Sequence, residues 1–265
     1  MSDAYWVQHG VQGAAVTKVG RREGAGAVPI RQVGRWFERV HLAALSNAPT
    51  VEVLGANRPL RGGGRTLGEL DLLYREGGRV VHREVAVKFY LAVGTGDHPS
   101  GWVGPGKKDS LELKLTRLLE HQCTLPSRAC EAGAWPEELP FPDVTEVLLL
   151  GALFSPVGQP RLPQGASQNA EHGRWYDASE FAERFDDASW CVLDKPWWLS
   201  PEHAREAVST SARELVKDLR RPVFVACVSG GVVERAFVVP DGWFEDLVRP
   251  RGGPKPPRLG RGRAE

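Results

Sequence analysis

Two runs of alternating polarity, joined by Gly77-Gly78, constrain the fold of this chain more than any other feature. The first run covers residues 66–73, Thr-Leu-Gly-Glu-Leu-Asp-Leu-Leu, and the second covers residues 82–90, His-Arg-Glu-Val-Ala-Val-Lys-Phe-Tyr. Two glycines between such runs are typical of a tight β-hairpin turn. A two-residue turn pairs Glu76 with Arg79, and counting outward from that pair predicts the register of the whole hairpin.

The predicted register gathers charge on one face of the hairpin. Asp71 falls opposite Glu84. Further from the turn, Glu69 falls opposite Ala86 and Leu67 falls opposite Lys88. The polar face then carries Glu69, Asp71, His82, Glu84 and Lys88, and the other face is apolar except for Arg83. The apolar face needs only a core, whereas the polar face calls for a separate explanation.

Carboxylates that face each other across a sheet destabilise it by a few tenths to ~1 kcal/mol per pair. A divalent cation removes this cost, because Mg²⁺ prefers oxygen ligands and usually needs only one or two protein carboxylates. Asp71, Glu84 and Glu69 are therefore candidate ligands for Mg²⁺ or Mn²⁺, and Lys88 is a candidate contact for a substrate anion. The alternative is a solvated hairpin face on which acidic and basic side chains simply alternate.

The arrangement resembles the restriction-endonuclease-like, or PD-(D/E)xK, nuclease superfamily. Residues 68–73 are similar to the Gly-Glu-x-Asp-Leu signature of its archaeal Holliday-junction resolvase branch. The resemblance implies an α/β core of helix, three strands, helix and strand, with Asp71 as the central metal ligand and Lys88 as a catalytic cation. The chain departs from the pattern at Ala86, where an acid is expected, and Glu84 lies one step back on the same face.

The whole chain also resembles a bacterial family defined by a domain of unknown function. The resemblance spans residues 28–248 and is carried by residues 33–39, 68–73, 86–91, 114–122, 197–201 and 221–225.

A first helix is predicted to begin near Pro29, with a buried stripe at helical spacing made of Val33, Trp36, Phe37, Val40 and Ala44. Glu38 lies on this helix, and the nuclease resemblance implies a first-helix glutamate in the active site. We therefore include Glu38 among the candidate catalytic residues; the alternative is an exposed surface glutamate.

Four segments are predicted along the chain. They are a weakly structured segment at 1–27, a nuclease-like core at 28–155, a C-terminal α/β extension at 156–248 and a disordered basic tail at 249–265. In the core, strands are predicted at 50–54, in the two hairpin runs and at 144–154, with a helix at 109–123. The extension is predicted to hold a polar loop at 155–176, helices at 178–185 and 201–219, and strands at 190–193, 223–228 and 232–239. The sequence leaves open whether the extension is a separate domain or continues the sheet of the core.

Basic residues near the second predicted helix are candidates for nucleic-acid binding. Lys107 and Lys108 precede the helix, and Lys114 and Arg117 share a stripe on it. Residues 101–108 nearly spell a P-loop, but Lys108 stands where a Ser or Thr is required, so nucleotide binding is rejected. A solvated basic face is the alternative reading of all four residues.

Composition narrows the class of protein. The net charge is +1, yet the tail from Arg249 is strongly basic, so the remaining chain is net acidic. The four cysteines have no C-x-x-C spacing, which predicts reduced thiols, and no secretory signal or membrane span is recognisable. We expect a cytoplasmic protein that acts away from the membrane.

Three hypotheses for function follow. The first is a metal-dependent nuclease that hydrolyses phosphodiester bonds in nucleic acid, with DNA favoured. The second is a catalytically inactive nuclease-fold module that binds nucleic acid or a protein partner, which the residue Ala86 favours. The third is a protein-interaction subunit whose hairpin face is merely solvated.

Overall fold

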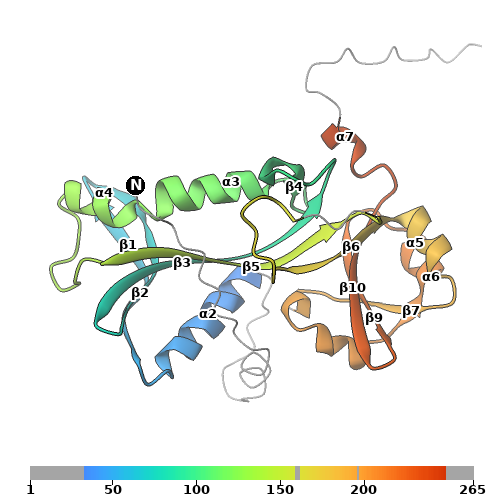
Figure 1. Ribbon diagram of the computed structural model, residues 1–265, viewed down its shortest axis with the longest axis horizontal. Coiled ribbons are helices and arrows are strands. Elements are labelled where there is room, and N and C mark those ends of the chain that lie inside the picture. The colour runs from blue at the N-terminus through green and yellow to red at the C-terminus, as the bar shows by residue number, and fades with distance from the viewer. Residues whose placement is uncertain (1–32, 159–161, 196, 249–265) are drawn as a thin grey trace, which may run out of the picture.

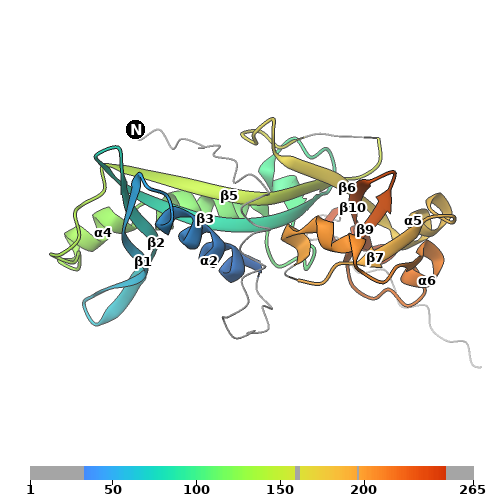
Figure 2. The same ribbon diagram turned by 90° about the horizontal axis from the view of Figure 1, so that it is seen from below.

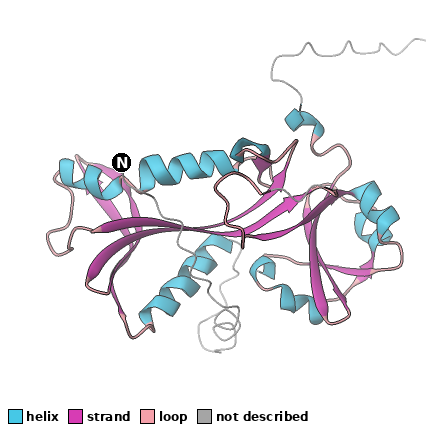
Figure 3. Ribbon diagram, in the orientation of Figure 1, coloured by secondary structure: helices cyan, strands magenta, loops and turns pink. Residues whose placement is uncertain are grey.

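A computed structural model describes residues 33–158, 162–195 and 197–248. These residues form a mixed α/β structure around one ten-stranded sheet, in the order β1-β2-β3-β5-β6-β10-β9-β7-β8, with β4 paired to β3 (Figures 1 and 3). The sheet runs the length of the molecule (Figure 2). The predicted segments 1–27 and 249–265, and the predicted start of the first helix near Pro29, lie outside the described residues.

The strands are β1 Val51–Gly62, β2 Arg65–Glu76, β3 Arg79–Ala92, β4 Trp102–Val103, β5 Val144–Ser155, β6 Glu171–Asp177, β7 Ser189–Val192, β8 Thr210–Ser211, β9 Val223–Ser229 and β10 Val232–Val239. The α-helices are α2 Val33–Ser46, α3 Leu111–Thr116, α4 Leu125–Glu131, α5 Ala178–Arg184, α6 Ala212–Val216 and α7 Glu245–Val248. A π-helical segment, η2 Arg117–Gln122, continues α3, and single 3₁₀ turns lie at η1 Pro99–Gly101, η3 Trp197–Leu199 and η4 Pro201–Arg205.

The hairpin prediction is correct near the turn and wrong further out. Glu76 pairs with Arg79 as counted, and the antiparallel register holds as far as Leu72 and Arg83. Beyond that pair the strands separate, because β2 continues along β1 while β3 continues along β5. Glu69 is therefore paired with Pro59 of β1, and the predicted pairings of Glu69 with Ala86 and Leu67 with Lys88 do not form.

Strand β3 is covered on both faces, which excludes a solvated face over most of its length. On one side, Val33 and Phe37 of α2 pack on the same core as Val85 and Val87. On the other side, α3 and η2 lie across the sheet (Figure 1). His82 and Glu84, predicted on the polar face, are both 0% exposed. This face of the hairpin is polar but buried.

The C-terminal half continues the sheet of the N-terminal half. Part of the predicted loop at 155–176 is strand β6, which pairs in parallel with β5 on one side and with β10 on the other. Aromatic rings of Phe89, Phe154, Phe224 and Phe237 form a shared core across the two halves. A separate C-terminal sheet is thereby excluded.

Other predictions are confirmed or corrected locally. The predicted helix at 201–219 is wrong, because this stretch divides into the 3₁₀ turn η4, the short strand β8 and the short helix α6, which begins at the side-chain cap of Ser211. Leu119, which lies on the π-helical segment η2, is 43% exposed. The four cysteines are free, as predicted. No helix in the described part of the chain is long and apolar enough to cross a membrane.

Candidate active site

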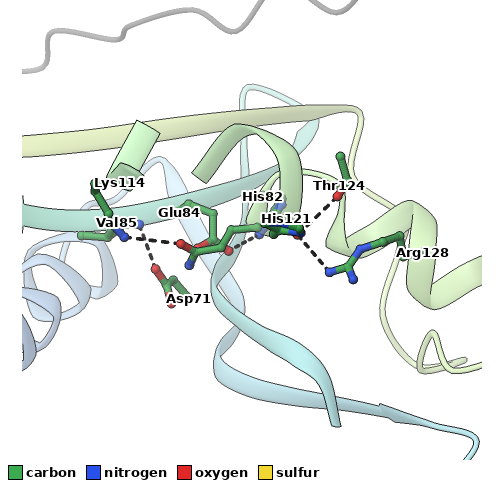
Figure 4. Close-up of polar contacts among 9 residues, drawn as sticks. Asp71, His82, Glu84, Val85, Lys114, His121, Thr124 and Arg128 are labelled. Carbon is green, nitrogen blue, oxygen red and sulfur yellow. Dashed lines mark hydrogen bonds and ion pairs between the residues drawn. The ribbon is translucent and has the colours of Figure 1, made fainter. Parts of the chain in front are cut away.

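Asp71 lies at the fork where β2 and β3 separate. Its Oδ2 accepts a hydrogen bond of 2.9 Å from the backbone N–H of Val85, so the carboxylate supplies an acceptor where the pairing with β2 has ended (Figure 4). The fork thus places a carboxylate between two strands instead of on the surface of one. Asp71 reaches the other candidate residues from this position.

The ladder ends one pair short of the predicted pairing of Asp71 with Glu84, but the two side chains still interact. The two carboxyl groups act on each other's ionisation, because two negative charges at close range are unfavourable in a protein interior. Burial raises the pKa of Asp71 to about 7, and the negative charge of Glu84 adds to this rise. Burial also raises the pKa of Glu84 to about 7. The pair therefore holds a proton near neutral pH that a bound cation would displace.

Two neutral donors orient Glu84 from its other side. His82 Nε2 lies 2.8 Å from Glu84 Oε1, and Gln122 Nε2 donates to Glu84 Oε2 at 2.5 Å (Figure 4). Burial lowers the pKa of His82 to about 4, so the ring is neutral at physiological pH and donates its Nε2 hydrogen to the carboxylate. The hydrogen bond from Gln122 lowers the pKa of Glu84 and so favours its charged form, but the effect of burial is larger.

Lys114 of α3 is the cation whose charge acts on both carboxyl groups. Its Nζ donates to Gln122 Oε1 at 3.4 Å, and its charge lowers the pKa of both Asp71 and Glu84. Burial lowers the pKa of Lys114 itself, and the neighbouring charges of Lys88 and Arg117 act in the same direction. Lys114, predicted as a nucleic-acid contact, is thus part of the carboxylate site.

Lys88, predicted as the catalytic cation, is paired elsewhere. Its Nζ donates to Asp109 Oδ2 at 2.5 Å, and the Tyr90 hydroxyl donates to the same oxygen at 3.4 Å. Asp109 directly precedes Ser110, whose side chain caps α3. The ion pair anchors the start of α3 on β3, and Lys88 still lies close enough to Lys114 to act on its pKa.

Glu38 and Glu69 surround Asp71 on the side of α2. Burial raises the pKa of Glu38, and the negative charges of Asp71 and Glu69 raise it further. Glu69 is exposed, since it lies on β2 beyond the fork. Glu38 also lines a small hollow beside Asp71, together with Asn57 of β1 and Val85 of β3. The first-helix glutamate predicted for the site therefore does lie beside Asp71.

Of the other predicted nucleic-acid contacts, Arg117, Lys107 and Lys108, the structure relates only Arg117 to the site. Arg117 is exposed and acts electrostatically on Lys114. Lys108 is exposed, whereas Lys107 adopts a left-handed conformation (φ 57°) and lies 5.3 Å from the ring centroid of Trp243. Lys107 thus contacts the C-terminal half of the protein rather than the carboxylates.

Among the described residues, no group of three or more His, Cys, Asp or Glu side chains is placed to hold a metal ion. Asp71 and Glu84 are a two-carboxylate oxygen set, which fits the hard cations Mg²⁺ and Mn²⁺, since these keep several waters and need few protein ligands. The residues present therefore fit such a cation through Asp71 and Glu84, with Glu38 beside them.

Sequence reasoning missed three contributors. Gln122, His41 and Asn57 come from η2, α2 and β1, and each reaches the site only through the packing of its element on the fork. Asn57 carried a weak signal, because an Asn before Arg-Pro is typical of an irregular backbone, and its φ is 49°. The sequence around His41 and Gln122 gave no such signal, because helical periodicity does not indicate which polar residues reach a site.

The fold and the site define a mixed α/β protein in which a half-buried and a fully buried carboxyl group, Asp71 and Glu84, lie together at a strand fork. A family model described as "Domain of unknown function (DUF1853)" matches residues 21–232, and the chain belongs to this family. No curated protein and no solved structure matches the chain.

Proposed function

We propose that this protein is a metal-dependent nuclease that hydrolyses phosphodiester bonds in nucleic acid, with DNA as the favoured substrate. The observation that carries the proposal is that a half-buried Asp71 and a fully buried Glu84 lie together at the fork, with the pKa of each raised to about 7. Two carboxyl groups held together away from solvent destabilise the fold. Carboxyl groups with pKa values perturbed in this way are typical of catalytic sites.

The order of elements supports the proposal. From α2 through β1, β2, β3 and α3 to β5, the chain follows the helix, three strands, helix and strand that the resemblance to PD-(D/E)xK nucleases implies. Asp71 and Glu84 lie on the second and third of these strands. The restriction-endonuclease-like core is accordingly part of the proposal.

The residues divide into three roles. Asp71 and Glu84 would hold Mg²⁺ or Mn²⁺, which when bound polarises a phosphate oxygen and acidifies water. Lys114 supplies a fixed positive charge for the developing charge on phosphate, the role predicted for Lys88. Arg117 and Lys108 are exposed cations on the same stretch of chain, available for the phosphates of the backbone.

A second candidate is an inactive nuclease-fold module that binds nucleic acid. Ala86 replaces the expected acid, and Lys88 is neutralised by Asp109. In addition, both oxygens of Glu84 already accept hydrogen bonds. These contacts favour a site that retains its architecture without turnover.

The test compares the purified protein with Asp71→Asn and with Asp186→Asn, a matched change at an exposed carboxylate of the C-terminal half. Linear, supercoiled, branched and single-stranded DNA, and RNA, are each incubated with Mg²⁺ or Mn²⁺. Cleavage by wild type and Asp186→Asn but not by Asp71→Asn is expected. Equal cleavage by all three, or by none, contradicts the catalytic proposal. Mn²⁺ binding that is lost in Asp71→Asn without any cleavage by wild type favours the inactive module.

A further inference from the structure

His41 of α2 is buried against Arg83, and this contact fixes its tautomer. The side chain is 5% exposed, and its Nε2 lies 3.2 Å from Arg83 Nη1. A guanidinium group carries only donors, so Nε2 must be the acceptor in this hydrogen bond. Burial and the charge of Arg83 lower the pKa of His41 to about 4, which keeps the ring neutral. The single ring hydrogen therefore lies on Nδ1.

The orientation of Arg83 is itself determined by a buried network. Glu146 Oε1 accepts a hydrogen bond from Arg83 Nε and another, of 2.7 Å, from the Tyr74 hydroxyl. The guanidinium also lies 4.9 Å from the ring centroid of Tyr74. On its other side His41 stacks on Phe37, with ring centroids 5.7 Å apart. The ring of His41 consequently has little freedom to turn over.

The Nδ1–H of His41 has no hydrogen-bond partner within residues 33–158, 162–195 and 197–248. Buried donors in native proteins are nearly always satisfied by protein or by ordered water. His41 Nδ1 is thus a buried donor that calls for an acceptor. His41 also lines a hollow in which such an acceptor could lie.

His41 lines the small hollow beside Asp71, which measures about 10 Å³. A buried water requires roughly 10–15 Å³ and two to four polar partners. The polar side chains that line this hollow are those of Glu38, His41, Asn57 and Asp71. The left-handed conformation of Asn57 shapes the wall of the hollow on the side of β1.

The hollow suits water better than a cation at the His41 end. A neutral imidazole that donates from Nδ1 has no lone pair to offer a metal there, whereas it can donate to a water oxygen. The carboxylates of Glu38 and Asp71 can in turn accept the hydrogens of that water. One donor and two acceptors around a space of this size describe a site for a single oriented water.

We propose that the hollow holds an ordered water to which His41 Nδ1–H donates, and that this water is the nucleophile of the phosphodiester hydrolysis proposed above, on which its catalytic role rests. The water oxygen bonds to phosphorus as the bond from phosphorus to the leaving oxygen breaks, and the leaving oxygen departs with the bonding electron pair and takes a proton from solvent. The proton released by the water passes to Glu38. His41 acts as a positioning residue that aims a lone pair of the water away from the imidazole.

Two measurements test the water site without any turnover. Long-range ¹H–¹⁵N spectra of the full chain assign the tautomer of His41, and a high-resolution crystal structure shows whether density for water lies within hydrogen-bonding distance of Nδ1. The expected results are a hydrogen on Nδ1 and a water that is absent from His41→Phe. A hydrogen on Nε2, or an empty hollow in the wild-type crystal, overturns the proposal.

Kinetics of matched variants test the role of the water. His41→Asn keeps an N–H donor at a position equivalent to Nδ1, whereas His41→Phe keeps the stacking on Phe37 but removes the donor. Arg39→Ala, at an exposed position of the same helix, is the control. His41→Phe is expected to lower kcat roughly 10- to 100-fold, as for a misplaced reactant, with KM for DNA and Mn²⁺ affinity nearly unchanged. His41→Asn should recover most of that loss.

The outcomes separate this inference from the proposed function. If His41→Phe cleaves DNA with the kcat of wild type, the nucleophile role is wrong while the nuclease remains. If wild type cleaves no nucleic acid but the water and the Nδ1 tautomer are observed, the nuclease proposal fails while the water site stands. Should His41→Phe fail to fold, equal kcat losses in His41→Asn and in His41→Gln, which keeps its amide at the Nε2 position, would overturn the positioning role.

Discussion

The molecule contains two hairpins with the same Gly-Gly turn and opposite outcomes. Gly77-Gly78 (φ 57° and 80°) joins β2 to β3, and Gly230-Gly231 (φ 55° and 83°) joins β9 to β10. The C-terminal hairpin stays paired from Ser229 and Val232 to Val223 and Val238. The N-terminal hairpin opens after Leu72 and Arg83.

The side chains on the two hairpins account for the difference. In the C-terminal hairpin Phe224 pairs with Phe237, and both rings are almost fully buried in one aromatic core. In the N-terminal hairpin the next pair would be Asp71 and Glu84, two carboxylates in a low-dielectric interior. Where the strands open, Asp71 accepts a hydrogen bond from the Val85 amide, and the charge of Glu84 helps to raise the pKa of Asp71. In this protein, backbone pairing of a hairpin ends at the point where two carboxyl groups come together.

The largest effect on stability is expected from the paired hairpin. Phe237→Ala removes a ring that is 0% exposed and contacts Phe154, Trp198 and Phe224. The free energy of unfolding should fall by about 3–5 kcal/mol. Urea denaturation measures this, with Val232→Ala, at an exposed position of the same hairpin, as the control. A loss no larger than that of the control would show that this hairpin does not carry the core.

A slightly smaller loss is expected where the open hairpin buries an ion pair. Glu146→Ala leaves Arg83 buried with His41 as a neutral partner, which should cost roughly 3 kcal/mol, since an uncompensated buried charge is unfavourable. Asp186→Ala breaks a pair with Arg213 at the surface and should leave the free energy of unfolding almost unchanged. Equal changes in the two variants, by thermal or urea unfolding, would contradict the buried network.

The smallest effect depends on pH. Asp71 and Glu84 have folded-state pKa values raised to about 7, so their stabilisation is present below their unfolded pKa values and is lost as pH rises through 7. His41 and His82, with pKa values lowered to about 4, act in the opposite direction between pH 4 and about 6.5. Whole-protein curves therefore partly cancel, and the contribution of the pair must be isolated by difference.

The variant Asp71→Asn isolates the contribution of the carboxyl pair to the pH dependence of stability. The neutral amide removes the repulsion, so this variant should gain stability relative to wild type as pH rises from 5 to 7, by ~1 kcal/mol per pH unit for one proton, and the difference should level off above the folded-state pKa. Parallel urea titrations of both proteins at several pH values measure the difference. A difference that stays constant from pH 5 to 7 would mean that the pKa of Asp71 is not raised in the folded protein.

Much of the N-terminal half followed from local pattern. Alternation and the Gly-Gly turn predicted β2, β3 and their register from Glu76 and Arg79 to Leu72 and Arg83, because the side-chain period of a strand fixes which residues share a face. The strand β6 was missed because it pairs only with distant partners and shows little alternation. The helix predicted at 201–219 failed for the converse reason, since tertiary contacts override a helical pattern there.

Local pattern was enough to place the two hairpins, the strand at Val144–Ser155 and the shared face of Asp71 and Glu84, since these depend on neighbours along the chain or across one turn. Contacts between distant elements set the rest: the hairpin opens after Leu72, Lys88 pairs with Asp109, and His41 lines the same hollow as Asp71. Each of these depends on how α2 and α3 pack on opposite faces of the sheet. Such packing depends on contacts between residues far apart in the chain, and these contacts leave no periodic pattern in the sequence.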